Sequence, residues 1–386
     1  MSEINRERLR QYLLDLVQID SHSREEGQVA ARVRADLEAL GVEVTVDDAG
    51  EKVGGDTGNV VARIKGTIPN APPIFIAAHM DTVVPGKGVK PVIDGDIIRT
   101  DGTTVLGGDD KSGVAIIVEC IRTLKEQNIP HSDIDAVFTI CEEVGLLGAK
   151  HLDMSSIRSK YGLVLDSDDV GYLFTKAPAA DHMEFVVHGL ESHAGVAPEN
   201  GISAIQIAAE AIASMKLGRI DHETTANIGI IEGGAATNII PNRVVLKAEA
   251  RSHDDTKLDA QTEHMRQALR SAAAKRSVVV DGETVRARVE DHVTREYHAM
   301  NVSDDSTIVQ LVMKAAANLN HQVKTLATGG GCDANVFNRR GLEVANLGTG
   351  MQAIHTVKEW LDVKDLYRSA DIVLEILKLN ASLDGE

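Results

Sequence analysis

Ile74-Phe-Ile-Ala-Ala-His79-Met-Asp81 is a run of apolar residues that ends in a histidine and an aspartate two positions apart. Residues i and i+2 of a strand point to the same side, so Asp81 can accept a hydrogen bond from one ring nitrogen of His79 while the other nitrogen binds a cation. Taken alone, the motif also fits a strand that ends in a polar turn. A second acidic loop, Gly107-Gly-Asp109-Asp-Lys111, favours a metal site.

Other segments repeat this arrangement of an apolar strand followed by an acid. Residues 134–141 predict a buried strand that runs into Glu142-Glu143, and residues 162–166 predict a strand that ends in Asp166. Apolar residues recur at helical spacing over 114–124, which places the 107–111 loop just before a helix N-terminus. In open α/β sheets ligands bind at the carboxyl ends of the strands, so these acids are expected to meet there.

The length and the change of pattern along the chain predict two domains. A chain of 386 residues exceeds one ordinary core. From residue 181 to 289 strands and helices alternate in a way that suits a compact α+β unit, and a helical pattern resumes at 307–319. We therefore expect an α/β domain, with a mostly parallel sheet flanked by helices, over 1–178 and 293–386. A smaller inserted α+β domain is expected over 179–292.

Composition restricts the partners and the compartment. The formal net charge is −18, which argues against nucleic acid or an anionic membrane surface as a partner. No apolar run approaches the roughly 20 residues needed to cross a bilayer, and the polar start lacks a signal-peptide pattern, so we expect a cytoplasmic protein. Three widely spaced cysteines, Cys120, Cys141 and Cys332, are expected to be reduced and buried.

Together the motifs resemble a known enzyme family. Their order and approximate spacing are similar to those of the two-zinc exopeptidases that include tripeptidase T, carboxypeptidase G and the carnosine dipeptidases, and the surrounding sequence is most similar to the tripeptidase T branch. The resemblance covers nearly the whole chain. It implies a zinc-exopeptidase catalytic domain with an inserted lid and dimerisation domain. The matched segments are His79-x-Asp81-Thr-Val, Gly107-Gly-Asp109-Asp-Lys-x-Gly113, Glu142-Glu143-x-Gly-x-x-Gly148-Ala, Asp166 and His355.

The resemblance implies two zinc ions per subunit. Asp109 would bridge them, His79 and Asp166 would complete the ligands of one ion, and Glu143 and His355 those of the other. Ligand chemistry agrees independently, because imidazole and carboxylate groups suit Zn²⁺.

The same resemblance assigns catalytic roles to Asp81 and Glu142. Glu142 and Glu143 are neighbours, so their side chains diverge, one towards metal and the other towards water. Zinc-bound hydroxide would attack the peptide carbonyl, with Glu142 as general base returning the proton to the leaving amine. A solvated turn is the commoner interpretation of an isolated Glu-Glu pair, but here the pair follows a predicted buried strand.

Three residues of the smaller domain also match the family. His193, in Glu191-Ser-His-Ala-Gly195, resembles a histidine that reaches across a dimer interface and stabilises the oxyanion. Asn238 and Arg251 match substrate-binding positions, and an arginine fork suits the free carboxylate of a peptide. A homodimer is therefore implied by the resemblance.

These observations predict a zinc-dependent aminopeptidase of the tripeptidase T type that acts on short peptides. Two alternatives are an amidohydrolase that removes an acyl group from an amino acid and an inactive relative that only binds peptide. Retention of Asp81, Glu142 and the metal ligands disfavours the inactive relative. Cys332 is expected to pack rather than to bind metal. A phosphate-binding loop at Gly107-Gly108 is disfavoured, because the acids that follow would repel phosphate.

Overall fold

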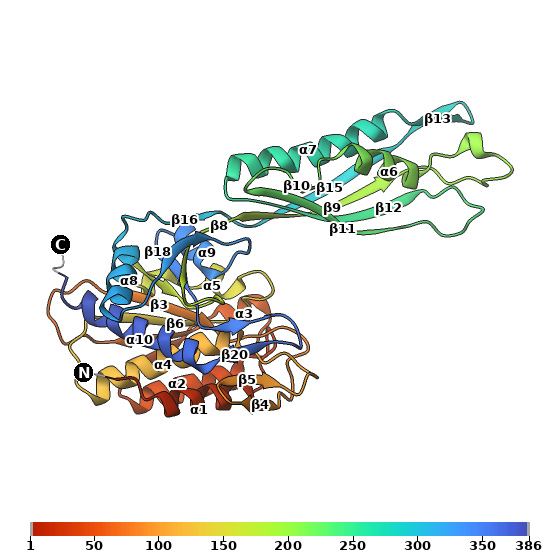
Figure 1. Ribbon diagram of the computed structural model, residues 1–386. Coiled ribbons are helices and arrows are strands. Elements are labelled where there is room, and N and C mark those ends of the chain that lie inside the picture. Colours follow the sequence, from red (N-terminus) through yellow and green to blue (C-terminus); the bar gives the residue numbers. More distant parts are fainter. Residues whose placement is uncertain (1–2, 384–386) are drawn as a thin grey trace. The chain divides into compact units, whose positions relative to one another are not determined.

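The computed structural model describes residues 3–383, and its chain divides into two compact units (Figure 1). The larger unit contains the residues up to Lys176, Asn301–Thr328 and those from Cys332 onwards, and the smaller contains Ala177–Met300 and Gly329–Gly331. Each unit is described by itself below. None of the helices within the described residues has the length and apolar character that a membrane span requires.

The larger unit mixes helices and strands. Its helices are α1 (Arg6–Val17), α2 (Gly27–Ala39), α3 (Ala49–Val53), α4 (Gly108–Glu126), α5 (Leu147–His151), α8 (Thr307–Asn318), α9 (Asp333–Arg339) and α10 (Val363–Asn380), with a 3₁₀ turn at Met154–Ser156. Its strands are β1 (Glu43–Val46), β2 (Val60–Ile64), β3 (Ile74–His79), β4 (Pro91–Asp94), β5 (Ile97–Thr100), β6 (Ile134–Thr139), β7 (Tyr161–Val164), β8 (Tyr172–Ala177), β16 (Met300–Asn301), β17 (Lys324–Ala327), β18 (Glu343–Leu347), β19 (Met351–Gln352) and β20 (Trp360–Asp362).

The main sheet has the order β1-β2-β6-β3-β7-β18-β8-β16, with β17 paired to β8. Its centre is parallel, because β6, β3, β7 and β18 run in one direction, while β1, β2 and β8 join antiparallel. Every residue of β3 and of β6 is buried, as expected for strands covered on both faces. The mostly parallel central sheet predicted from the sequence is confirmed.

Helices pack on this central part of the sheet. Helix α4 contacts β3, α8 contacts β7 and β18, and α10 contacts both α4 and α8. Helices α5 and α9 contact each other, and α9 also contacts β7 and β18. A separate small sheet of order β19-β20-β5-β4 joins the segment after β18 to the hairpin before α4. This pairing holds residues 353–359, which connect β19 to β20, next to the hairpin that precedes α4.

The smaller unit is a five-stranded antiparallel sheet of order β10-β11-β12-β9-β15 with two helices. Helices α6 and α7 pack on the sheet, and their apolar residues form one core with the inward side chains of β9 and β12. Its elements are β9 (Ala179–His188), α6 (Ala204–Ser214), β10 (Gly218–Arg219), β11 (Thr224–Gly233), β12 (Arg243–Ser252), α7 (Asp255–Ala274), β13 (Ser277–Val280), β14 (Glu283–Arg286) and β15 (Arg288–Tyr297), with a 3₁₀ turn at Pro198–Asn200.

Candidate metal centre

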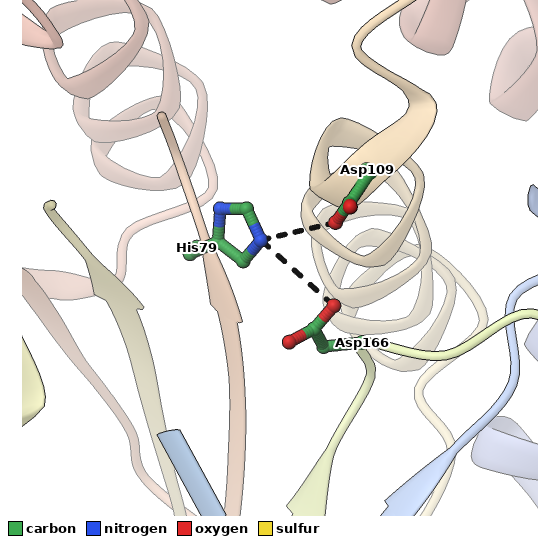
Figure 2. A group of neighbouring side chains, drawn as sticks. All are labelled: His79, Asp109 and Asp166. Carbon is green, nitrogen blue, oxygen red and sulfur yellow. Dashed lines mark hydrogen bonds and ion pairs between the residues drawn. The ribbon is translucent and has the colours of Figure 1, made fainter. Parts of the chain in front are cut away.

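Three side chains converge at the carboxyl end of the parallel strands (Figure 2). His79 is the last residue of β3, Asp109 lies at the start of α4, and Asp166 follows β7. His79 Nε2 lies 3.1 Å from Asp109 Oδ1 and 3.8 Å from Asp166 Oδ1. These separations suit three ligands around one cation.

A second group shares Asp109 with the first. His355 Nε2 lies 3.1 Å from Asp109 Oδ2 and 2.9 Å from Glu143 Oε2. The two carboxylate oxygens of Asp109 therefore face different imidazoles, His79 on one side and His355 on the other. A carboxylate with this placement can bridge two metal ions.

Burial and contacts with the two imidazoles shift the pKa values of the carboxyl groups at the centre. Burial raises the pKa of Asp166 well above its usual value and raises the pKa of Glu143. Burial would also raise the pKa of Asp109, but hydrogen bonds from the two imidazoles outweigh it and hold that pKa below its usual value. Contacts with Asp109 and Glu143 raise the pKa of His355 to about 10.

The residues present fit a pair of divalent metal ions. Imidazole binds metal in its neutral form, so a bound cation would displace the proton that a pKa of about 10 places on His355. Among the described residues, the buried Oε1 of Glu143 finds no hydrogen-bond partner, although it belongs to one of the ligand groups. Nitrogen and oxygen donors of this kind suit Zn²⁺ and related ions.

Glu142 lies beside the second group and is buried. Loss of hydration raises the pKa of Glu142 well above its usual value, and the nearby carboxylate of Asp166 raises it further. Its backbone N–H donates to Asp81 Oδ1 over 2.9 Å. A buried carboxyl group with a raised pKa beside a metal centre has the properties of a general base.

Asp81 contacts more groups than the sequence led us to expect. His79 Nδ1 lies 3.0 Å from the backbone oxygen of Asp81 and 3.4 Å from its Oδ1. The carboxylate of Asp81 also accepts the backbone N–H of Glu142 and of Glu143, as well as the hydroxyl of Ser23. It therefore orients the turn that carries Glu142 in addition to the imidazole of His79.

Sequence analysis missed three buried side chains that hold the ligand loops. Asn346 accepts the N–H of Asp166 over 2.9 Å and donates to its carbonyl oxygen over 2.6 Å. Glu26 accepts the N–H of Cys141, and Glu359 accepts three N–H groups of the 106–109 segment. None of the three carried a local signal in the sequence, because the backbone groups that each one contacts lie more than a hundred positions away.

Cys332 lies near the centre but belongs to neither ligand group. It is buried, and its sulfur accepts a hydrogen bond from Asn346 Nδ2 over 3.4 Å. These contacts agree with the expected packing role. Asp110, the neighbour of Asp109, accepts the backbone N–H of His79 over 3.1 Å and so fixes the end of β3.

The other predicted site residues belong to the smaller unit. His193 and Asn238 lie on two loops joined by backbone contacts, since Ala194 N–H donates to the carbonyl oxygen of Asn238 over 2.9 Å. Arg251 is on β12, where its guanidinium donates to Glu249 over 3.1 Å and to the carbonyl oxygen of Gly329 over 3.4 Å. Its Nε is buried without a partner among the residues that the structure describes.

Known proteins match the chain closely. A family model described as Peptidase family M20/M25/M40 matches residues 75–379. The uncharacterized protein YqjE of Bacillus subtilis (strain 168) is 43% identical over 376 residues, which cover 97% of this chain and 99% of that protein.

Solved structures show the same fold along nearly the full length. Aminopeptidase PepT from Bacillus cereus ATCC 10987 superposes with a TM-score of 0.91 at 41% identity, with coverage of 98% of this chain and 100% of that one. A tripeptidase from Staphylococcus aureus subsp. aureus Mu50 superposes with a TM-score of 0.93 at 38% identity and the same coverage. The predicted family resemblance and fold class are thus confirmed.

Proposed function

Because the chain belongs to peptidase family M20/M25/M40, we propose that it is a two-metal aminopeptidase that acts on short peptides such as tripeptides. The observation that carries this proposal is the shared carboxylate of Asp109, whose two oxygens face His79 and His355. A shared carboxylate between two ligand groups is the arrangement that a pair of catalytic metal ions needs. The similarity to an aminopeptidase and a tripeptidase supports the substrate class.

We propose two Zn²⁺ ions per subunit as the cofactor. One group is His79, Asp109 and Asp166, and the other is Asp109, Glu143 and His355. When bound, the ions would polarise the scissile carbonyl and increase the acidity of water. The chain's own contribution is to hold these side chains in position through buried hydrogen bonds.

Glu142 is proposed as the group that moves the proton. It takes a proton from the attacking water as the new C–O bond forms. It then donates that proton to the amide nitrogen as the C–N bond breaks, which releases an amine and a carboxylic acid. Burial of Glu142 supports this role, because loss of hydration raises the pKa of its carboxyl group and so makes the carboxylate a stronger proton acceptor.

For the smaller unit we propose roles in substrate binding and dimerisation. Arg251 and Asn238 would hold the substrate, with Arg251 binding the free carboxylate of the peptide. His193 would stabilise the oxyanion in the active site of the partner subunit. A homodimer is supported by exposed apolar side chains on α6, on β11 and in the loop after His193. They are Ile205, Ile230, Ile231 and Val196.

We propose the cytoplasm as the compartment. Cys120, Cys141 and Cys332 are all free and buried. Cysteines that stay unpaired are usual where thiols are kept reduced. The metal-binding and peptide-hydrolysing roles do not depend on this assignment.

The proposed function is tested by the release of free amino acids from a panel of dipeptides, tripeptides, tetrapeptides, N-blocked tripeptides and N-acyl amino acids. Zinc-loaded and chelator-stripped protein are compared on each compound. We expect zinc-dependent cleavage of peptides with a free amino end, with tripeptides preferred. Cleavage of the N-acyl amino acids alone would instead identify an amidohydrolase, and no cleavage in either state would identify a protein that only binds peptide.

A further inference from the structure

The glycine-rich segment before Asp109 binds a carboxyl group of the protein itself, that of Glu359. Glu359 Oε2 accepts the backbone N–H of Leu106 over 2.7 Å and that of Gly107 over 2.9 Å. Its Oε1 accepts the N–H of Asp109 over 3.1 Å. The carboxyl group of Glu359, which lies between β19 and β20, thus satisfies three backbone donors of a loop that is far away in the sequence.

The two glycines of this segment explain how the carboxylate fits. Gly107 has φ of 70°, a left-handed conformation that glycine adopts at little cost. A Cβ on Gly108 would lie 3.1 Å from Glu359 Oε1, which is tighter than an ordinary contact. The Gly107-Gly108 pair therefore makes room for Glu359 directly beside the bridging ligand Asp109.

Glu359 is buried with an exposed fraction of 2%, so solvent does not replace these hydrogen bonds. It also lies four residues after His355, the imidazole that faces Asp109 Oδ2. One short segment therefore supplies a metal ligand and fixes the backbone of the carboxylate that both metal ions share. Loss of the contact is expected to affect both ions, because Asp109 belongs to both groups.

We propose that Glu359 is a positioning residue for the metal centre: it fixes the loop of Asp109 and thereby sets the affinity of both metal sites. The inference rests on the proposed two-metal function. Glu359 itself is not a ligand in either group. Its action through the backbone distinguishes it from residues whose side chains face the ions.

The test replaces Glu359 by Gln and measures Zn²⁺ binding by competition with a chromogenic chelator. Gln has nearly the same shape, but its NH₂ group would face a backbone donor and leave it unsatisfied. We expect both sites to bind Zn²⁺ about 10- to 100-fold more weakly, as is usual when a group that supports metal ligands is removed. Hydrogen exchange of the 106–109 amides is expected to accelerate in the same variant.

Glu119→Gln is the matched control. Glu119, on α4, is equally buried and holds Arg8 and the N–H of Asn5 at the start of α1, and it belongs to neither ligand group. That variant is expected to lose stability while its Zn²⁺ affinity stays at the wild-type value. If Glu359→Gln fails to fold, Glu359→Asp decides, since its shorter side chain cannot reach all three donors.

Wild-type Zn²⁺ affinity at both sites in Glu359→Gln, or in Glu359→Asp where that variant is the one that folds, would overturn the inference. An equal loss of affinity in Glu119→Gln would also overturn it, because the effect would then follow from general destabilisation. A wild-type protein that binds no Zn²⁺ would instead contradict the proposed metal centre, and with it this inference. Measuring wild-type binding first keeps the two failures apart.

Discussion

The backbone N–H of Glu142 donates to Asp81 Oδ1 over 2.9 Å, so the proposed general base is held by the same residue that faces the imidazole of His79. The other oxygen of Asp81 accepts the N–H of Glu143 over 3.2 Å. A single buried carboxylate therefore connects one proposed ligand, on β3, with the proposed base and a second proposed ligand on the turn after β6. This relationship makes Asp81 a structural centre of the site as well as a partner of His79.

Replacing Asp81 by Asn is expected to lower kcat/KM and Zn²⁺ affinity together, each by about 10- to 100-fold. The amide has one oxygen, so its NH₂ group must face either the N–H of Glu142 or that of Glu143. Activity assays and a Zn²⁺ titration check this. Normal affinity combined with normal turnover would show that the turn keeps its geometry without the carboxylate.

Replacing Glu142 by Gln is expected to leave two Zn²⁺ ions bound with near-normal affinity while hydrolysis falls by about two to four orders of magnitude. The amide keeps the shape of the side chain but removes the proton carrier. Metal content by elemental analysis and peptide hydrolysis are measured on the same preparation. Retained activity would remove Glu142 from the role of base.

Glu26 predicts a pH dependence of stability. Burial raises the pKa of Glu26 to about 6, above the unfolded value of 4.5, and the nearby charge of Asp81 adds to this rise. The folded state thus binds the proton of Glu26 more tightly than the unfolded state does. The protonated side chain therefore contributes fully to the free energy of unfolding below about pH 4.5, and this contribution is lost as the pH rises through 6. This shift corresponds to about 2 kcal/mol.

Urea unfolding of metal-free wild-type protein and of Glu26→Gln between pH 4 and pH 7 tests this. The variant cannot titrate at this position. The difference in free energy of unfolding, variant minus wild type, is therefore expected to increase by about 2 kcal/mol from pH 4 to pH 7. A constant difference between the two proteins across the range would contradict the prediction.

His193→Ala is expected to reduce turnover without changing the Zn²⁺ content, because His193 belongs to neither ligand group. If its imidazole acts in the partner subunit, mixed dimers of His193→Ala and Glu142→Gln subunits contain one complete active site. Such mixtures are expected to regain part of the activity that each variant lacks alone. Unchanged turnover in His193→Ala would end this role.

Most residues of the two candidate ligand groups could be singled out from local sequence. His79, Asp109, Glu143 and Asp166 each follow an apolar strand or precede an apolar helix, and parallel strands bring their carboxyl ends to one edge. Local sequence does not single out His355, because no long helix or strand precedes it and its backbone has φ of 60°. It was identified through the resemblance to a family.

The supporting contacts could not be predicted in this way. Glu359 and Glu26 look like ordinary charged residues in the sequence, and Asn346 looks like a polar residue within an apolar strand. Each is buried and bonded to a backbone group more than a hundred positions away. No periodicity encodes such a pairing.

By itself the sequence determined the strand ends, the ligand types and the parallel sheet, because apolar periodicity and short-range spacing specify local elements and the edge at which they end. Only the tertiary structure decided that Asp109 faces two imidazoles and that Glu359 and Asp81 hold the loops around it. The physical reason is that backbone N–H groups lose their water when distant segments pack together, and each must then find a hydrogen-bond partner among the side chains buried with it.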